Sequence, residues 1–403
     1  MVTPTLTRDG GVAAHVRASA AALAAQGVAV SVVATNIEQA DGLEQVTLHR
    51  CARLRDPTAP LQERVGDTLS PPPDVIHLHH VDDPGLTLAL RAFAPVLVSA
   101  HVYTACPSGA HYFRPGEECT RAHGPGCVPN LLLRGCAHTR YPKTLPRKYA
   151  EAGRGRAALA ACDLAVSYSS AVDRHLADNG ISHRAIVPYF PTMAARPRSP
   201  QAPTRRVVFA GRMVRTKGVE VLLRAARDVE VELVLCGDGR ELAAMRALAE
   251  RLGIAARTHF RGWMGAEELA QELADASIVA VPSLWPEPFG IVGIEAFAAG
   301  RPAIASDTGG IPDWLEHGVN GLAVPAGDVG ALSGALSALL EDPQRQQAMG
   351  LAGRATVAAQ FSGERHVEAL RSAYAQARER WAAGRGELPL GASAPAPAPT
   401  APS

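Results

Sequence analysis

Residues 207–218 read VVFAGRMVRTKG, and this stretch decides the fold. Its unbroken apolar run suits a strand that is buried on both faces, as in a parallel sheet. Gly211 ends the run, Arg212 follows it, and Lys217 stands where a helical pattern begins. A strand that passes through a short turn into a helix is the repeating unit of a doubly wound α/β fold.

The same alternation extends in both directions from this stretch. Short runs rich in Val, Ile, Leu and Ala predict strands at 28–34, 74–79, 95–100, 164–167, 205–210, 231–236, 277–281 and 302–305. Segments with helical spacing lie between them, at 11–26, 217–228, 239–252, 266–275 and 291–299. Strands that alternate with helices predict parallel sheets covered on both faces.

The chain has 403 residues, which is too long for one ordinary core, so we expect two domains. The break falls at AARPRSPQAPT (194–204), which has no periodicity and carries three prolines. The expected division is a first domain at 1–195, a linker at 196–204, a second domain with terminal helices at 205–382, and a disordered Ala/Pro tail at 383–403. A doubly wound domain normally opens on a buried strand. Either the few residues before Gly10 supply that strand, or it lies upstream.

The composition of the chain limits the classes of partner that we expect. A net charge of +1 gives no electrostatic case for nucleic acid or an anionic membrane as the main partner. No apolar run approaches the roughly 18 residues that a membrane span needs, and the start of the sequence lacks a signal-peptide pattern. We therefore expect a cytoplasmic protein with at most peripheral membrane contact, at the inner membrane face.

The turn after the strand at 207–210 carries two cations, Arg212 and Lys217. A nucleotide-diphosphate leaving group carries dense negative charge, which a guanidinium, an ammonium and the amides of a helix N-terminus can hold. The alternative is a pair of solvated surface cations. Lys occurs only at 143, 148 and 217, and the other positive side chains are Arg, which favours a function for Lys217.

A second stretch, VPSLWPEPFGIVGIEAFAAG (281–300), carries two carboxylates. Glu287 lies in a loop after a strand, and Glu295 lies about one turn into the next helix. A loop carboxylate can accept hydrogen bonds from sugar hydroxyls, and a helix carboxylate suits a vicinal diol such as ribose. Alternatively, Glu287 is a loop charge and Glu295 a partner of the helix dipole. Burial without a partner is costly, and Glu295 stands in an otherwise apolar helix, which favours a ligand.

The start of that helix supplies backbone donors. Its first amides have no partner within the helix, so they can meet the sugar or the diphosphate. These amides belong to Phe289, Gly290 and Ile291.

Together these stretches resemble the signature of glycosyltransferase family 4, in which two Glu separated by seven residues follow a Pro-Ser strand end. CGDGRE (236–241), HFRGWM (259–264) and SDTGGIPDWLEHGVNGLAVPAGD (306–328) resemble further segments of that family's donor domain, in the expected order. The resemblance covers most of 205–360. It implies a GT-B fold, with two facing Rossmann-like doubly wound domains, parallel sheets and an interdomain cleft. It also implies a retaining glycosyltransferase.

The resemblance assigns roles to these residues. Arg212 and Lys217 would bind the diphosphate, Glu287 the transferred sugar and Glu295 the ribose. Four further donor-binding positions are implied, the last two with backbone that faces the nucleobase: Gly211, Gly237, Gly262 and Trp263.

The N-terminal half resembles the family more loosely. RDGGVAAHVRASAAALAAQGVAVSVVA (8–34) is similar to the family's opening Gly-Gly turn, helix and second strand. Gly10 and Gly11 could let the backbone approach the donor phosphates or the acceptor, or they could form a simple tight turn.

Histidines end two predicted strands, in DVIHLHH (74–80) and in VLVSAH (96–101), where they should face the cleft. His101 resembles the family's histidine near the transferred sugar, where it would orient the acceptor or a donor hydroxyl. Val102 stands where the family usually has Asp, which puts an inherited acid role at this point in doubt.

Four cysteines fall in a Gly-, Pro- and His-rich insertion at about 102–143: Cys106, Cys119, Cys127 and Cys136. Four thiols can hold a structural zinc, form two disulfides, or do neither. The spacings of twelve, seven and eight lack the close pairs of familiar zinc sites, but a reducing cytoplasm favours zinc over disulfides. A subgroup of the family looks similar after this histidine. We expect the insertion to shape acceptor specificity, and the chemistry to need no cofactor.

The predicted function is transfer of a sugar from a nucleotide-diphosphate-sugar donor to a lipid, glycan or natural-product acceptor. The sequence shows no convincing nucleophile-and-acid pair for a double displacement, so same-face attack through a short-lived oxocarbenium-like species fits better. Two alternatives stay open: a nucleotide-sugar epimerase of GT-B fold, and a non-catalytic protein that binds sugar nucleotides.

Overall fold

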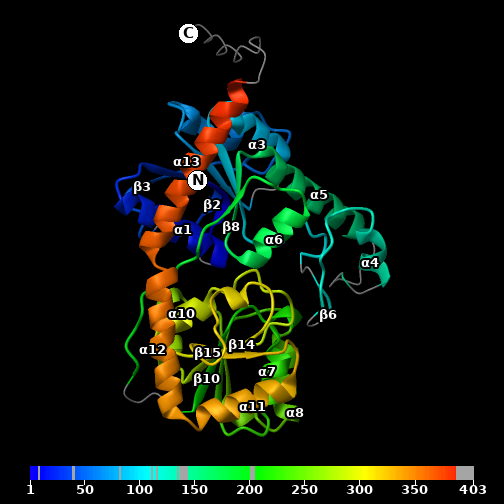
Figure 1. Cartoon of the computed structure of the whole chain (residues 1–403), viewed down its shortest axis with the longest axis vertical. Coiled ribbons are helices and arrows are strands. Elements are labelled where there is room, and N and C mark those ends of the chain that lie inside the picture. The colour runs from blue at the N-terminus through cyan, green and yellow to red at the C-terminus, as the bar shows by residue number, and fades with distance from the viewer. Residues whose placement is uncertain are drawn as a thin grey trace.

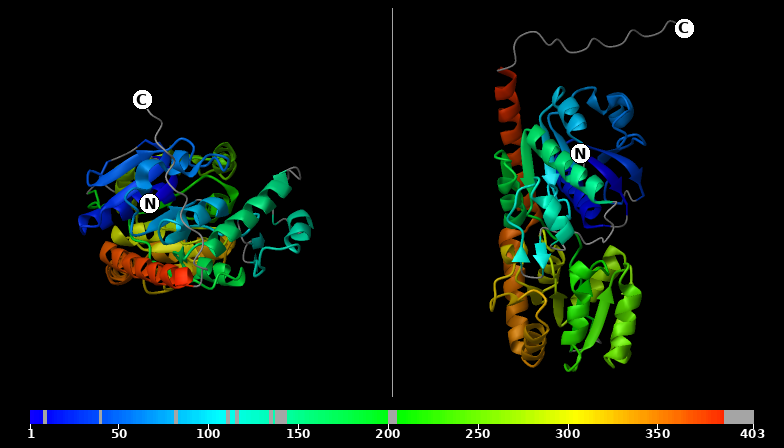
Figure 2. Two further views of the ribbon diagram at one scale, coloured as in Figure 1. Left: turned by 90° about the horizontal axis from the view of Figure 1, so that it is seen from above. Right: turned by 90° about the vertical axis from the view of Figure 1, so that its right-hand side faces the viewer.

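The computed structural model of the chain describes residues 1–7, 10–38, 41–80, 83–109, 112–114, 117–133, 136, 144–199 and 205–386. Two α/β domains lie one above the other along the longest axis, each built around its own parallel sheet (Figure 1). In the right-hand view of Figure 2 the strands of the second domain stand between helices. The predicted α/β class with two doubly wound domains is therefore confirmed.

The first sheet has the spatial order β3-β2-β1-β4-β5-β8-β9, and its neighbouring strands pair in parallel. Its strands are β1 (Val2–Leu6), β2 (Val30–Ile37), β3 (Val46–Arg50), β4 (Ile76–His79), β5 (Val96–Ala100), β8 (Leu164–Ser167) and β9 (Arg184–Ile186). The opening strand thus comes from the few residues before Gly10. The strand order reverses between β1 and β4, which is where such sheets bind ligands.

The second sheet repeats the pattern, with the order β12-β11-β10-β13-β14-β15 and parallel pairing. Its strands are β10 (Arg206–Ala210), β11 (Glu232–Cys236), β12 (Thr258–Gly262), β13 (Ile278–Val281), β14 (Ala303–Ser306) and β15 (Gly321–Val324). Here the order reverses between β10 and β13.

Helices connect these strands. Those of the first domain and its insertion are α1 (Gly11–Ala25), α2 (Leu61–Val65), α3 (Pro84–Arg91), α4 (Cys127–Leu133), α5 (Leu145–Ala161) and α6 (Ser170–Asp178). The later helices are α7 (Val219–Ala225), α8 (Leu242–Arg251), α9 (Ala266–Asp275), α10 (Val292–Ala298), α11 (Val329–Leu340), α12 (Pro343–Gln360) and α13 (Gly363–Gly386). None of the described helices is long and apolar enough to cross a membrane.

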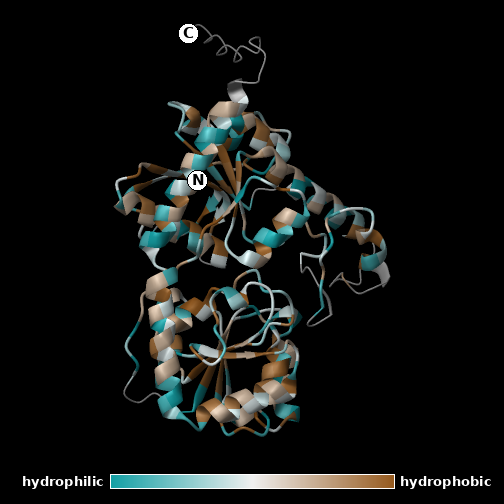
Figure 3. Ribbon diagram, in the orientation of Figure 1, coloured by the Kyte–Doolittle hydropathy of each residue, from teal (hydrophilic) through white to brown (hydrophobic). Residues whose placement is uncertain are grey.

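The core of each domain lies where helices meet the sheet. In the second domain, Leu222 of α7, Leu233 of β11 and Leu336 of α11 are fully buried in one cluster. Figure 3 shows the strands of both sheets in the brown of hydrophobic residues. Burial of such side chains, each worth about 1.5–3 kcal/mol, stabilises both sheets.

The last helix differs from the expected division of the chain. Although α13 follows the second domain in sequence, it packs on the first: Val367 and Leu370 share a core cluster with Val16 of α1. Figure 1 shows this helix, in red, beside the N-terminal sheet. Further along it, the Trp381 indole donates to the Arg91 carbonyl at 2.8 Å. Judged by its packing contacts, α13 belongs to the first domain, and the second domain ends before it.

The linker and the tail are described in part. At the linker, Ser199 donates to both oxygens of Asp275, which fixes this end of the linker to the second domain. Residues 200–204 and 387–403 lie outside the described residues. The helix α13 runs to Gly386, so residues 383–386, which were expected in the disordered tail, are helical because the Ala- and Arg-rich sequence continues the helix.

The cysteine-bearing insertion projects beside the two domains (Figure 1). Its described parts include a small antiparallel hairpin, β6 (Tyr112–Arg114) with β7 (Glu117–Glu118), and the helix α4. The hairpin reaches the second domain, where a Glu118 carboxylate oxygen accepts a hydrogen bond from the Gly309 amide at 2.9 Å. The insertion therefore contacts both domains.

Candidate active site

The predicted donor-binding side chains come from the two loops that flank the reversal of strand order in the second sheet. Arg212 and Lys217 follow β10, and Glu287 follows β13. Because the carboxyl ends of parallel strands meet at one edge, these loops are neighbours. Glu295 follows in the helix α10 after the second loop.

Close backbone packing joins the two loops. The Leu284 amide donates to the Thr216 carbonyl at 2.8 Å. Gly218 has φ 70°, and a Cβ added there would stand 1.8 Å from the Pro282 carbonyl oxygen. Only glycine fits such a position, because a side chain would force the loops apart. The turn that carries Lys217 is thereby held against the loop that carries Glu287.

Lys217 and Glu287 form a bidentate ion pair, with Nζ 2.7 and 2.8 Å from the two carboxylate oxygens. Ser283 Oγ and Trp285 Nε1 also donate to Glu287 Oε2, at 2.8 and 2.9 Å. Burial alone would raise the pKa of this carboxyl, but the Lys217 charge and these hydrogen bonds lower it below its usual value. Glu287 is therefore a buried, ionised acceptor in a fixed position.

Arg212 lies at the rim of the same site. Its side chain is exposed, and within the described residues its guanidinium forms no ion pair or hydrogen bond. A guanidinium without an ion-pair partner among the described residues, in the same loop as Lys217, is available to an incoming diphosphate. Its predicted contact with phosphate stays a prediction.

Glu295 is buried on α10, and one of its carboxylate oxygens accepts a hydrogen bond from Thr192 Oγ1 at 3.1 Å. Thr192 lies in the segment that leads from the first domain to the second, and no sequence pattern predicted its contact with Glu295. Burial raises the pKa of Glu295 to about 7, an effect that the hydrogen bonds from Thr192 partly offset. The carboxyl thus changes charge near neutral pH.

The loop between the two glutamates is held by Trp314, which sequence reasoning also missed. Its Nε1 donates to the Phe289 carbonyl at 2.6 Å, and its ring covers Gly290 and Gly293. Ile291 is the residue before α10, so the three predicted backbone positions do lie at the start of this helix. Small residues at 290 and 293 were the available signal, because they leave room for a large ring.

The remaining predicted donor positions lie along the same sheet edge. The Gly211 amide donates to the Cys236 carbonyl, and the Gly237 amide donates to the Gly262 carbonyl, so the ends of β10, β11 and β12 are joined. Trp263 follows β12 and is 54% exposed. An exposed indole beside a sheet edge suits stacking on a planar ring.

In the first domain, the Gly-Gly turn stands between β1 and α1. Gly10, with φ 107°, precedes the helix, and Gly11 is its first residue. Both are exposed, and a Cβ at either would meet nothing within 4 Å. The turn therefore presents open backbone, and Arg8 and Asp9 beside it lie outside the described residues.

His101 occupies the predicted strand end but is enclosed there. Its Nε2 lies 3.0 Å from His79 Nδ1, and its Nδ1 lies 2.9 Å from the Tyr189 hydroxyl. Burial, followed by the charge of His80, lowers the pKa of His101 well below its usual range, so the ring is neutral near pH 7. Both ring nitrogens are thus engaged within the first domain.

Two aromatic contacts join the histidine end of the first domain to the donor loop. Tyr189 packs on Phe289 with ring centroids 5.0 Å apart, and Tyr103 packs edge-on against Trp285 at 6.4 Å. His101 therefore reaches the donor loop through Tyr189. Neither tyrosine belongs to a motif, which is why the sequence did not single them out.

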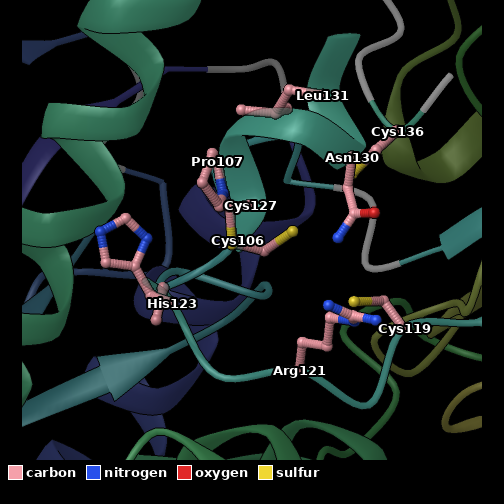
Figure 4. Close-up of a pocket in the computed structure, with 10 residues that line it drawn as sticks. Cys106, Pro107, Cys119, Arg121, His123, Cys127, Asn130, Leu131 and Cys136 are labelled. Atoms are coloured by element: carbon pink, nitrogen blue, oxygen red, sulfur yellow. The ribbon is translucent and has the colours of Figure 1, made fainter. Parts of the chain in front are cut away.

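The four cysteines of the insertion line one small pocket (Figure 4). Within the described residues, no three His, Cys, Asp or Glu side chains are already arranged to hold a metal ion. Burial raises the pKa of Cys119, and that of Cys136 to about 11, so neither thiol suits nucleophilic chemistry.

Comparison with known proteins shows which family and folds the chain resembles. Residues 195–356 match the family model described as glycosyl transferases group 1. The chain is 38% identical over 183 residues to a D-inositol 3-phosphate glycosyltransferase of Corynebacterium jeikeium, which covers 42% of this chain and 43% of that protein. It is 36% identical over 159 residues to a GDP-mannose-dependent alpha-(1-6)-phosphatidylinositol monomannoside mannosyltransferase of Mycolicibacterium smegmatis, covering 37% and 42%. The chain thus matches less than half the length of these curated relatives.

Solved structures resemble the chain over nearly its whole length. Sucrose-phosphate synthase from Thermosynechococcus elongatus superposes with a TM-score of 0.69 and 21% identity, covering 93% of this chain and 98% of that one. HepE from Anabaena, in complex with UDP, gives a TM-score of 0.66 and 18% identity, covering 93% and 99%. The fold of the whole chain is therefore GT-B, and its residues 195–356 form a domain of the glycosyl transferases group 1 type.

Proposed function

We propose that this chain is a retaining glycosyltransferase of family 4, which moves a sugar from a nucleotide-diphosphate donor to a hydroxyl of a lipid, glycan or natural product. The observation that carries the proposal is the Lys217–Glu287 pair at the reversal of strand order, with Arg212 exposed beside it. This arrangement supplies positive charge for a leaving group and a fixed acceptor for a sugar at one point. The match of this domain to the glycosyl transferases group 1 model supports it.

In the proposed reaction Arg212 and Lys217 hold the diphosphate. As the bond from the sugar C1 to the phosphate oxygen breaks, negative charge grows on that oxygen, and the two cations stabilise it. The acceptor oxygen bonds to C1 from the same face, and its proton passes to the departing phosphate. When the donor binds, the Lys217 ammonium would donate hydrogen bonds to the phosphate as well as to Glu287.

Glu287 would hold the transferred sugar. Three side chains already donate to its carboxylate, a setting that suits positioning a hydroxyl better than attacking a carbon. Glu295 would receive the ribose diol, the amides of Phe289, Gly290 and Ile291 would meet the sugar or diphosphate, and Gly262 and Trp263 would face the base. His101 would act on the transferred sugar only after exchanging a present hydrogen bond, so we assign it a positioning role through Tyr189.

We place the reaction in the cytoplasm, with any membrane contact made through the acceptor. Gly10 and Gly11 would line the acceptor side of the cleft. The relatives named for inositol phosphate and phosphatidylinositol mannoside substrates support a polyol or glycolipid acceptor.

The test is a panel of nucleotide sugars that begins with GDP-mannose and UDP-sugars, with nucleoside diphosphate release as the readout. Free nucleotide together with a glycosylated product, whose anomeric configuration NMR shows to be retained, supports the proposal. Isomerised sugar nucleotide would indicate an epimerase, and binding without turnover a non-catalytic protein. Thermal-shift screening with UDP, GDP, ADP and TDP selects the base, because a ligand at about 100 times its Kd adds about 2.7 kcal/mol of stability.

A matched control variant distinguishes the effect of removing Lys217 from the effect of removing any one lysine charge. Lys148 is a half-buried lysine of α5, outside the donor loops. Lys148→Ala should retain turnover, whereas Lys217→Ala should lose most of it. Equal activity in both variants would remove the basis of the proposal.

A further inference from the structure

The insertion gathers four thiols around one cavity. Cys106, Cys119, Cys127 and Cys136 line a space of about 20 Å³. A cavity of roughly 10–15 Å³ already holds one water-sized sphere, so this space suits a single ion or water. Figure 4 shows the cysteines approaching the space from different sides. They come from four separate parts of the insertion, so ordinary helix or strand periodicity does not explain their meeting.

The sulfur atoms share polar neighbours. Ser108 Oγ lies 3.2 Å from Cys106 Sγ and also hydrogen-bonds Cys136. Arg121 contributes both a backbone hydrogen bond and its positive charge to the Cys119 sulfur. A positive group beside a set of thiols is the kind of neighbour that stabilises thiolates around a metal. All seven cysteines of the chain are free thiols in the structure.

We propose that Cys106, Cys119, Cys127 and Cys136 bind one structural Zn²⁺. Four thiolates at about 2.3 Å in a tetrahedron form the closed type of zinc site, which leaves no position for substrate. Binding replaces the thiol protons, which pass to solvent, and no electron is transferred. Within the described residues the four sulfurs are not yet arranged as a metal site, so binding of the ion would bring them closer together.

The zinc site has a mechanical consequence for the second domain. Cys119 directly follows Glu118, whose carboxylate accepts from Gly309 N at 2.9 Å and lies 3.4 Å from Thr308 Oγ1. That turn is itself bound to the donor loop, because the Gly310 amide donates to the Glu287 carbonyl at 2.7 Å. A metal on Cys119 would therefore hold the contact between the insertion and the Thr308–Gly309 turn, which is itself bound to the loop of Glu287.

Metal analysis of the full chain, purified with reductant and then dialysed against EDTA, tests the site. We expect about one equivalent of zinc in the unaltered chain. Cys119→Ser should lose it, whereas Cys51→Ser should keep it. Cys51 is a matched control, because both cysteines are 8% exposed and Cys51 lies outside the pocket. Cobalt in place of zinc should give cobalt–thiolate charge-transfer absorption.

Several results would overturn the proposal. Zinc far below one equivalent in the unaltered chain is one, and equal retention in both variants is another. Disulfides between pocket cysteines, found by peptide mapping without reductant, would also reject it.

If Cys119→Ser does not fold, the unaltered chain decides the matter. Removing zinc with a strong chelator in the presence of reductant should expose four additional thiols to alkylation and increase deuterium uptake in the insertion several-fold. Unchanged labelling would reject the metal. None of these measurements depends on turnover, so they stand apart from the proposed function.

The link to the second domain has its own test. Glu118→Ala should increase deuterium uptake at Gly309 and Gly310 with zinc content unchanged. Glu117→Ala, one residue earlier on the same exposed strand, is the control. Unchanged uptake at both glycines in Glu118→Ala would show that the insertion does not hold this turn.

Discussion

Removing the ammonium of Lys217 should separate the stability of the donor loop from its function. In Lys217→Ala, Glu287 keeps its hydrogen bonds from Ser283 and Trp285 but loses its counter-ion. Breaking a fully buried ion pair costs about 3–5 kcal/mol. Here the Glu287 side chain is 6% exposed and that of Lys217 21%, and two donors remain, so we expect about 2–3 kcal/mol.

The expected loss of stability can be measured as a fall in Tm. For a domain of this size, each kcal/mol lowers the Tm by about 2–4 °C, which gives a fall of roughly 4–12 °C. The second substitution, Glu287→Gln, removes the unpaired buried charge. The double variant Lys217→Ala, Glu287→Gln should therefore recover most of the lost Tm.

Turnover should not recover with stability. Loss of one charge-stabilising donor at a reacting oxygen costs about 10²–10³ in rate, so kcat/KM for the donor should fall by that factor in Lys217→Ala. The double variant should remain at least as slow. A Lys217→Ala chain with wild-type Tm and with kcat/KM within about threefold of the wild-type value would refute the reasoning. So small a change does not indicate that an interaction made in the transition state has been lost.

Three further predictions concern neighbouring groups. The pKa of Glu295, raised to about 7, means that the folded chain binds more protons than the unfolded chain between 4.5 and 7, so stability should fall as the pH rises through this window. Only the ionised form of Glu295 accepts hydrogen bonds from a diol on both oxygens. Nucleoside diphosphate affinity, measured by calorimetry, should therefore rise by up to about tenfold per pH unit below about 7 and level off above it. The substitution Glu295→Gln should abolish this pH dependence. Gly218→Ala should lower the Tm and donor affinity together, since its Cβ would stand 1.8 Å from the Pro282 oxygen; an unaltered melting curve would contradict this. Tyr189→Phe should cost about 1–3 kcal/mol in denaturant unfolding by leaving a buried His101 nitrogen unpaired, and no change would show that this hydrogen bond is unimportant.

The central strands could be predicted from the sequence because they are buried on both faces. Each of the eight predicted apolar runs overlaps a strand, such as β10 and β13. The edge strands β3, β9, β12 and β15 were missed. Polar residues interrupt the apolar run of the first three, as in THFRG at Thr258–Gly262, and β15 has only four residues, Gly321–Val324.

Site residues could be predicted from the sequence where a charged residue stands in a loop directly after a predicted strand. Lys217 and Glu287 were identified, but their direct pairing was not, because the contact between Thr216 and Leu284 joins segments far apart in the chain. Thr192 was missed for the same reason. Its role depends on where the segment between the domains crosses α10, which tertiary packing sets.

The sealing of the first domain by α13 has a consequence for biosynthesis. The surface that α13 covers, with Val16 of α1 among its residues, is translated before the second domain, but α13 leaves the ribosome only after that domain. At about 5–20 residues per second, the intervening second domain takes roughly 10–30 s to make. During that interval the apolar surface around Val16 on the nascent first half stays accessible to chaperones. A fragment ending near residue 195 should aggregate when expressed alone and be rescued by co-expression with the remainder of the chain.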